Sequence, residues 1–144
     1  ITVNPGILDV QVTANPSTII SKQQTEISIY VTCNAKPVTG ASVTISSDSG
    51  SLSSTTGVTD SNGRCTFIFN APETAADLSI VVEVNAAKNG YVSAESQITI
   101  TVIPETGGWS ITTILLITIP IVLAVVVIVL VKLKIISFSA EEND

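Results

Sequence analysis

The stretch Glu26-Ile-Ser-Ile-Tyr-Val-Thr-Cys33 alternates polar and apolar side chains along its whole length. Successive side chains of an extended strand point to opposite faces, so its apolar residues share one face and its polar residues share the other. The same alternation recurs in residues 78–85, where Ser79 and Glu83 separate apolar neighbours. A strand of this kind packs against a core on one side and meets water on the other. The pattern therefore predicts half-buried strands in a layered β protein.

Outward from this stretch, the period of two continues from residue 8 to residue 102 and is interrupted by turn residues every 8 to 15 positions. This spacing is typical of an all-β sandwich. Seven strands match a constant-type immunoglobulin-like (Ig-like) domain, an antiparallel β-sandwich that we expect over residues 8–103. The expected strands are residues 8–14, 26–33, 42–47, 55–59, 64–70, 78–85 and 97–102.

Three short motifs lie in the loops and at the strand starts of this region. They are Pro37-Val-Thr-Gly-Ala-Ser-Val-Thr44, Gly50-Ser-Leu52 and Thr59-Asp-Ser-Asn-Gly-Arg-Cys-Thr-Phe67. Through these motifs, residues 9–103 resemble the bacterial Ig-like repeats of invasin and intimin type. The resemblance implies an extracellular stalk or adhesin module. Because the motifs encode turn chemistry and strand pattern, they specify the fold and carry over no binding residue.

Residues 111–131 form an uncharged run of 21 residues, ITTILLITIPIVLAVVVIVLV. At helical rise this run spans about 30 Å, the thickness of the hydrocarbon core of a bilayer. It lacks the one-sided apolar stripe of a soluble amphipathic helix. We therefore expect a single transmembrane α-helix, in which Pro120 produces a kink more than a break.

The residues that flank this run predict its orientation. Lys132 and Lys134 follow it at once, whereas the 20 residues before residue 111 contain no Lys or Arg. The positive-inside rule then places residues 132–144 in the cytoplasm as a tail, and the sandwich outside. Trp109 lies where an indole favours the outer membrane interface. The expected localisation is a cell membrane of archaeal or Gram-positive-like type, crossed once, with the N-terminal domain extracellular.

The composition excludes several classes of function. Four cations stand against nine carboxylates before the helix, a net charge of −5, which disfavours nucleic acid as a partner. The chain has no His, no Met and two Cys, so the usual metal ligands and proton-transfer groups are missing. We therefore expect no enzyme activity, cofactor, metal or small-molecule substrate. The expected partners are membrane lipid and either other domains of a longer chain or a protein partner.

A short string occurs twice, once at each end of the expected domain. Ile1-Thr-Val-Asn-Pro5 is echoed 99 residues later by Ile100-Thr-Val-Ile-Pro104. A period of this length suits tandem sandwich repeats, so residues 1–7 are expected to be the end of a preceding repeat or a linker. The absence of an initiator Met and of a signal peptide also favours a chain that begins upstream. Coincidence is the alternative, since Ile, Thr and Val are common in any strand.

The junction between sandwich and helix allows two interpretations. The segment formed by Ile103, Pro104, Glu105, Thr106 and Gly107 looks like a sortase signal of Leu-Pro-Glu-Thr-Gly type, followed by an apolar run and lysines. Ile replaces the usual Leu, and the 13-residue tail ends in acidic residues, where sortase substrates have a short basic tail. The other interpretation is a juxtamembrane linker over residues 104–110.

The two cysteines are expected to form a disulfide within one sheet. An exported domain with an even number of cysteines favours a bridge. In a constant-type sandwich the second and fifth strands are antiparallel neighbours, which brings the end of the strand at Cys33 near the start of the strand at Cys65. The alternative is a pair of free thiols that act as small apolar residues.

Together these features favour a membrane-anchored extracellular Ig-like module, the membrane-proximal stalk of a larger prokaryotic cell-surface or adhesin-type protein. A small accessory subunit of a membrane complex, with its sandwich capping the outer face, is one alternative. A sortase-anchored wall protein is another.

Overall fold

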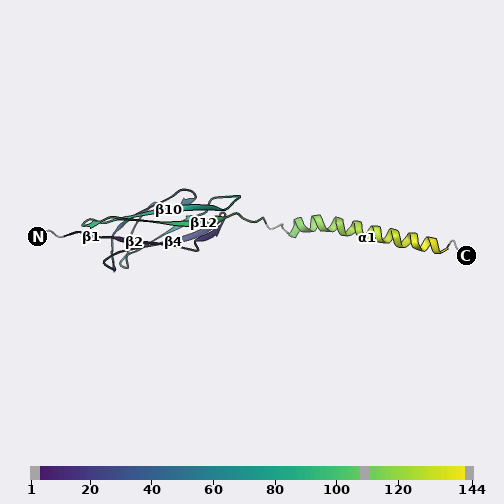
Figure 1. Cartoon of the computed structure of the whole chain (residues 1–144), viewed down its shortest axis with the longest axis horizontal. Coiled ribbons are helices and arrows are strands. Elements are labelled where there is room, and N and C mark those ends of the chain that lie inside the picture. Colours follow the sequence, from purple (N-terminus) through teal and green to yellow (C-terminus); the bar gives the residue numbers. More distant parts are fainter. Residues whose placement is uncertain (1–3, 108–110, 142–144) are drawn as a thin grey trace. The chain divides into compact units, whose positions relative to one another are not determined.

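The structure, a computed structural model, describes residues 4–107 and 111–141. The chain divides into two compact units, residues 1–105 and 106–144. The first unit is built from strands and the second contains one helix (Figure 1). The sequence-based prediction of an Ig-like β-sandwich followed by one long apolar helix is confirmed.

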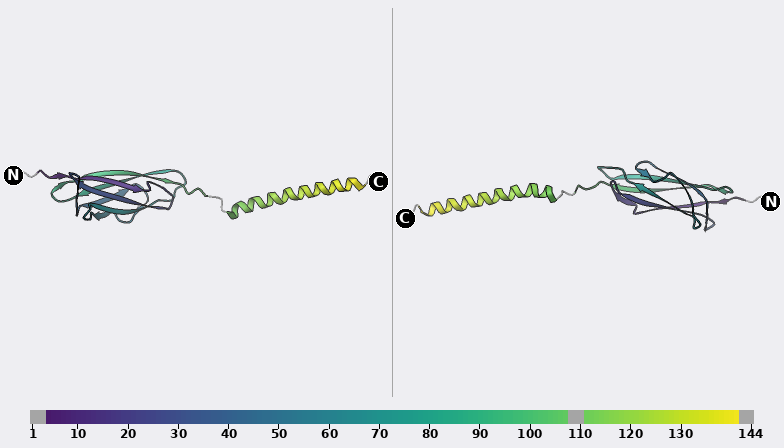
Figure 2. Two further views of the ribbon diagram at one scale, coloured as in Figure 1. Left: turned by 90° about the horizontal axis from the view of Figure 1, so that it is seen from below. Right: turned by 180° about the vertical axis from the view of Figure 1, so that it is seen from behind.

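Two sheets form the sandwich, and the view in Figure 2 shows them as two layers. The first sheet has the order β2 (Asp9–Asn15), β4 (Gln24–Cys33), β9 (Arg64–Asn70) and β7 (Ser51–Leu52), with β5 (Lys36–Pro37) paired to β4. The second sheet has the order β3 (Thr18–Ile20), β12 (Ala94–Ile103), β10 (Leu78–Ala87), β6 (Ser42–Ser47) and β8 (Thr56–Val58). A separate ladder joins β1 (Gly6–Ile7) to β11 (Tyr91–Val92).

The N-terminal segment of the sandwich changes partners along its length. It first pairs in parallel with β11 through β1, then crosses to the first sheet as β2, and returns to pair in parallel with β12 through β3. Between these two parallel ladders, β2 contacts β12 across the gap between the sheets. The segment therefore covers an edge of β12 that would otherwise be open to pairing with another chain.

All seven expected strands are present, and β6 and β9 match the expected bounds. The other five agree with their expected ranges to within three residues at either end. Sequence analysis did not anticipate β1, β3, β5, β7 and β11, each of which has two or three residues. Segments this short contain no readable alternation, because a period of two needs about four residues or more to be recognised.

The core lies between the two sheets and consists of the inward-facing residue of each alternating pair. Ile27, Ile29 and Val31 of β4 are at most 1% exposed, and they face Ile80, Val82 and Val84 of β10, at most 2% exposed. The largest fully buried side chain is Phe69 of β9. Among the described residues, every buried side-chain N or O atom has a hydrogen-bond partner.

Thr59 joins two of the motifs that carry the family resemblance. Its side chain is buried, its Oγ1 donates to the Val38 carbonyl at 2.6 Å, and the same oxygen accepts from the Ala41 N–H at 2.9 Å. The backbone of Thr59 also exchanges hydrogen bonds with Gly40 and Ala41. Asp60, the next residue, accepts the N–H groups of Asn62 and Arg64 at 2.8 and 2.9 Å and closes the turn before β9. The two loop motifs therefore form a single hydrogen-bonded unit.

Gly50 should be far less replaceable than Gly40, although both have left-handed backbones with φ of +79° and +72°. A Cβ at Gly50 would lie 2.6 Å from the Asn70 carbonyl oxygen and 2.6 Å from the Phe69 ring, whereas nothing lies within 4 Å of one at Gly40. We expect Gly40→Ala to cost about 1–2 kcal/mol of unfolding free energy from backbone strain alone. Gly50→Ala should carry the same backbone strain and should lose a further ~1–3 kcal/mol of unfolding free energy from overpacking. Chemical denaturation of the two variants measures the difference, and equal losses would contradict the packing at Gly50.

The second unit contains α1 (Ile111–Glu141), a helix of 31 residues. Pro120 lies within the helix, which continues on both sides of it, so the helix is not broken there. The helix also continues past residue 131, the last residue of the expected membrane span, to Glu141. Every side chain described between residues 115 and 133 is exposed.

Candidate functional site

The helix α1 provides the first candidate site, a contact surface for lipid. Within it, Leu115–Leu133 is a run of 19 residues that is long and apolar enough to cross a membrane. None of this run is buried against protein, which distinguishes it from the core helix of a soluble domain. Lys132 and Lys134 lie on the helix at the end of this run, whereas Trp109 lies outside the described residues. The roles assigned to Trp109, Pro120, Lys132 and Lys134 at the membrane stay predictions.

The sortase-like segment begins inside the sandwich. Ile103 is the last residue of β12, where it pairs with Ile20 of β3, and its carbonyl accepts the Ser21 N–H at 2.8 Å. Glu105, Thr106 and Gly107 are exposed, as a linker or a recognition sequence requires. The linker and sortase interpretations of this segment both stay predictions.

The structure corrects the predicted disulfide, because Cys33 and Cys65 are both free thiols. The two strands are neighbours as expected, but the register pairs Cys65 with Ile29, four residues before Cys33. Four residues span about 13 Å along a strand, whereas bridged Cα atoms lie about 4.4–6.8 Å apart. The sequence argument failed because β4 runs past the start of β9. There, the Val31 N–H bonds to the carbonyl of Gly63, in the turn before β9, and Cys33 pairs with Lys36 of β5.

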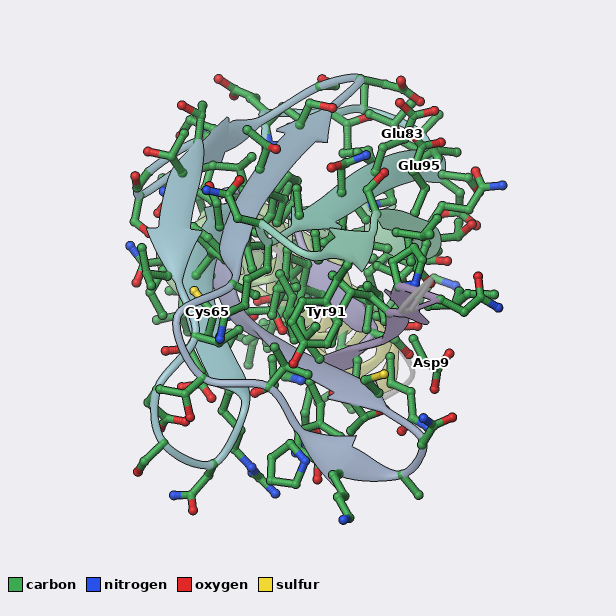
Figure 3. The ribbon with its side chains drawn as sticks, turned by 90° about the vertical axis from the view of Figure 1, so that its left-hand side faces the viewer. Asp9, Cys65, Glu83, Tyr91 and Glu95 are labelled. Carbon is green, nitrogen blue, oxygen red and sulfur yellow. The ribbon has the colours of Figure 1, made fainter. Side chains whose placement is uncertain are left out.

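Each cysteine is partly buried and packs against the core at its own location. The Cys33 sulfur lies beneath Gly6, where an added Cβ would be 2.5 Å from it. The Cys65 sulfur lies beneath Gly57 of β8, where an added Cβ would be 2.6 Å from it. Figure 3 marks Cys65 at the side of the sandwich near β8 and β9. The glycines allow strands β1 and β8 to lie close over the two thiols.

We expect mass spectrometry of the unreduced, denatured protein to find two alkylated cysteines. Burial raises the pKa of the Cys65 thiol, so at a given pH a smaller fraction of it is the reactive thiolate. In a folded Cys33→Ser variant, alkylation of Cys65 should be slower than alkylation of an exposed cysteine in a peptide. As the pH is raised, the alkylation rate of Cys65 should continue to increase after the rate of the peptide cysteine has reached its plateau. A disulfide between the two residues would contradict this structure.

A second candidate site is a hollow of about 570 Å³ on the outward face of the second sheet. The register places Glu83 of β10 opposite Gln97 of β12, and Asn85 opposite Glu95, and the Asn85 amide donates to the Glu95 carboxylate at 3.0 Å. Figure 3 shows Glu83 and Glu95 on this face. The other lining residues are Thr44, Ile45, Ser46, Thr55, Val84 and Ser96. The hollow can accept hydrogen bonds, but it contains no nucleophile paired with a base.

Sequence analysis missed the hollow because its residues come from three strands and from Thr55, which precedes β8. On each strand the polar residues alone match an ordinary solvated face. Only the pairing order β12-β10-β6 brings Gln97, Glu83 and Ser46 into one row. Among the described residues, no group of three or more His, Cys, Asp or Glu side chains could hold a metal ion.

No protein-family model matches the sequence, and no curated protein is significantly similar to it. Several solved structures share its fold. The D00-D0 domain of intimin superposes with a TM-score of 0.56 at 13% identity, covering 71% of this chain and 50% of that chain. For the D0-D1 domain of intimin the TM-score is 0.52 at 19% identity, covering 67% and 50%.

A C-terminal 282-residue fragment of intimin, solved in complex with the intimin-binding domain of the translocated intimin receptor, gives a TM-score of 0.51 at 19% identity. That match covers 64% of this chain and 32% of the fragment. This chain therefore spans half or less of the intimin chains that it matches. Identities this low show the fold alone. The sandwich is an Ig-like domain that is structurally similar to the D00-D0 and D0-D1 domains of intimin.

Proposed function

We propose that this chain is the membrane-anchored, membrane-proximal stalk module of a larger prokaryotic cell-surface protein of adhesin type. In this proposal the sandwich over residues 8–103 is extracellular, residues 104–110 are a linker, residues 111–131 cross the membrane and residues 132–144 lie in the cytoplasm. The observation that carries the proposal is an intimin-like sandwich followed in the same chain by an exposed apolar run of 19 residues.

The placement of the two ends of the sandwich supports a spacer role. The chain enters at the β1–β11 ladder, beside the first residues of β12, and leaves after Ile103, the last residue of β12. These points lie at opposite ends of a 10-residue strand, which spans about 33 Å. A domain whose ends lie far apart lengthens a chain with each copy. One such module would hold whatever precedes it about 30 Å farther from the bilayer.

The interior of the sandwich suits a stalk module. Both sheets contribute apolar side chains to a single continuous core, and the loops around Thr59 and Asp60 are fixed by hydrogen bonds. Because the described residues present no catalytic set, we assign binding to protein and lipid contacts. We propose membrane lipid, other domains of the same longer chain or a separate protein as the partners, and no enzymatic substrate.

Extraction of native membranes with alkaline carbonate, followed by mass spectrometry of the retained protein, tests this proposal. We expect the polypeptide to stay in the membrane pellet and to exceed the 15.0 kDa of the present sequence. A retained polypeptide of about that mass would favour a small accessory subunit. Release of the intact polypeptide by carbonate would overturn the membrane anchor itself.

A further inference from the structure

The end of the sandwich at which the chain enters, called here the entry end, exposes apolar side chains. Ile7 of β1 is 70% exposed, Val92 of β11 is 45% exposed and Tyr91 is 37% exposed. All three belong to the two-residue β1–β11 ladder, and Figure 3 shows Tyr91 near the middle of this end. Exposed apolar residues that gather in one place, with polar residues around them, are typical of an interaction surface.

Most cations of the outer domain lie at one end of it. Lys36, Arg64 and Lys88 lie at the entry end, in β5, at the start of β9 and after β10 respectively. The Lys88 ammonium lies 5.7 Å from the centre of the Tyr91 ring and also donates to the Thr39 carbonyl. Three of the four cations before the helix are thus at the entry end, together with the carboxylates of Asp9, Asp60 and Glu95.

The opposite end, called here the exit end, is acidic. Glu73 and Asp77 lie in the loop between β9 and β10, and Glu105 follows β12. The one cation there, Lys22, is paired with Glu73 at 2.9 Å. Its hydrogen bond to Glu73, together with the Glu73 charge, raises the pKa of Lys22, and Glu105 adds to the effect. A copy of this fold would therefore present an acidic exit end to the Lys36 and Lys88 ammonium groups at the entry end of the next copy.

The repeated string limits the distance between two such copies. In this domain Ile100-Thr-Val102 is the end of β12, with Ile100 and Val102 fully buried, and Pro104 follows. If the echo Ile1-Thr-Val3 ends β12 of a preceding copy, only Asn4 and Pro5 separate it from β1. Two residues reach about 7 Å, and proline holds the residue before it in an extended conformation. Two domains joined by so short a linker must be in contact.

From these observations we propose that the entry end, formed by Ile7, Tyr91 and Val92 with Lys36 and Lys88 around them, is the docking surface for a preceding Ig-like copy. The acidic exit end of that copy lies against these side chains and makes the joint rigid. This inference rests on the proposed function, because it requires a longer chain.

Hydroxyl-radical footprinting tests the joint, by comparing the native membrane protein with the present chain, residues 1–144, in detergent. Burial in an interface core removes most of the exposed area of a side chain. Tyr91 is 37% exposed here, so we expect its oxidation to be about fourfold or more slower in the native protein. Ile20, which is also 37% exposed but belongs to β3 at the exit end, is the internal reference and should react equally in both.

A substitution in the native-length chain provides the second arm. Val92→Asp should restore the oxidation of Tyr91 to the rate of the 144-residue chain, and Ile20→Asp, at a comparably exposed position in the exit end, should not. The native chain could be longer than 144 residues and still show Tyr91 oxidised as fast as in the 144-residue chain. That result would overturn the proposed joint but not the stalk function. A native polypeptide that begins at Ile1 would overturn both.

Discussion

Replacing Phe69 with alanine should lower the free energy of unfolding of the sandwich by about 3–5 kcal/mol. Phe69 is 0% exposed and is the largest fully buried side chain of the domain. It pairs with Thr25 on β4 and with Leu52 on β7, and its ring lies against Gly50. The total free energy of unfolding of a domain of this size is about 5–15 kcal/mol, so the variant should be close to unfolding at physiological temperature.

Urea denaturation of the 144-residue chain in detergent, followed by the near-ultraviolet signal of the sandwich, measures this loss. Phe69→Leu is the matched control, because it keeps an apolar side chain of comparable volume and should cost about 1–2 kcal/mol. A loss below about 1 kcal/mol for Phe69→Ala would mean that this position is not in a close-packed core.

Ending the chain after Gly107 should move the sandwich from the membrane fraction to the soluble fraction. Residues 1–105 form a compact unit with its own core, so the shortened protein should fold without the helix. The 19-residue apolar run that it loses is the candidate membrane span, and nothing else described in the chain has that length and apolar character. Fractionation by ultracentrifugation measures the shift, and circular dichroism verifies that the soluble product contains strands.

A chain ended after Lys134 is the matched control for the truncation. It keeps the apolar run and both lysines, and it should stay in the membrane fraction with the complete chain. If the chain ended after Gly107 also stayed in the pellet while remaining folded, the sandwich itself would bind the membrane and the helix would not be its sole anchor.

Most of the seven main strands could be predicted because they bury a single face. In β4 and β10 this requirement produces an alternation of apolar and polar residues that is typical of a half-buried strand. The short strands could not be predicted, because their pairing depends on where the longer strands lie. The Gly6–Ile7 segment, for example, is a strand only because β11 lies beside it.

The position of the cysteines depended on register, which alternation alone does not determine. Shifting β9 by two residues along β4 would keep every apolar side chain on the same face. The sequence could thus predict that Cys33 and Cys65 both face the core, but it could not predict their separation. The turn closed by Asp60 determines the separation of the two cysteines. In this turn the Gly63 carbonyl accepts the Val31 N–H, and β9 then begins opposite Tyr30.

The sequence revealed one of the candidate sites and not the others. The apolar run and its lysines are continuous in the chain, so the candidate membrane helix could be predicted directly. The entry end and the hollow at Glu83 are assembled from residues far apart in the sequence. The role of Thr59 was also hidden, since a buried threonine that joins two loops has the same local pattern as a threonine on a solvated strand.

Lysine labelling of intact cells with a membrane-impermeant reagent tests most directly whether the sandwich is outside and the tail inside. Lys22, at the exit end of the sandwich, is exposed, and Lys134 follows the apolar run. We predict that Lys22 is labelled in intact cells and that Lys134 is labelled only after the cells are permeabilised. Labelling of Lys134 in intact cells while Lys22 stays protected would contradict the orientation and, with it, the proposed stalk.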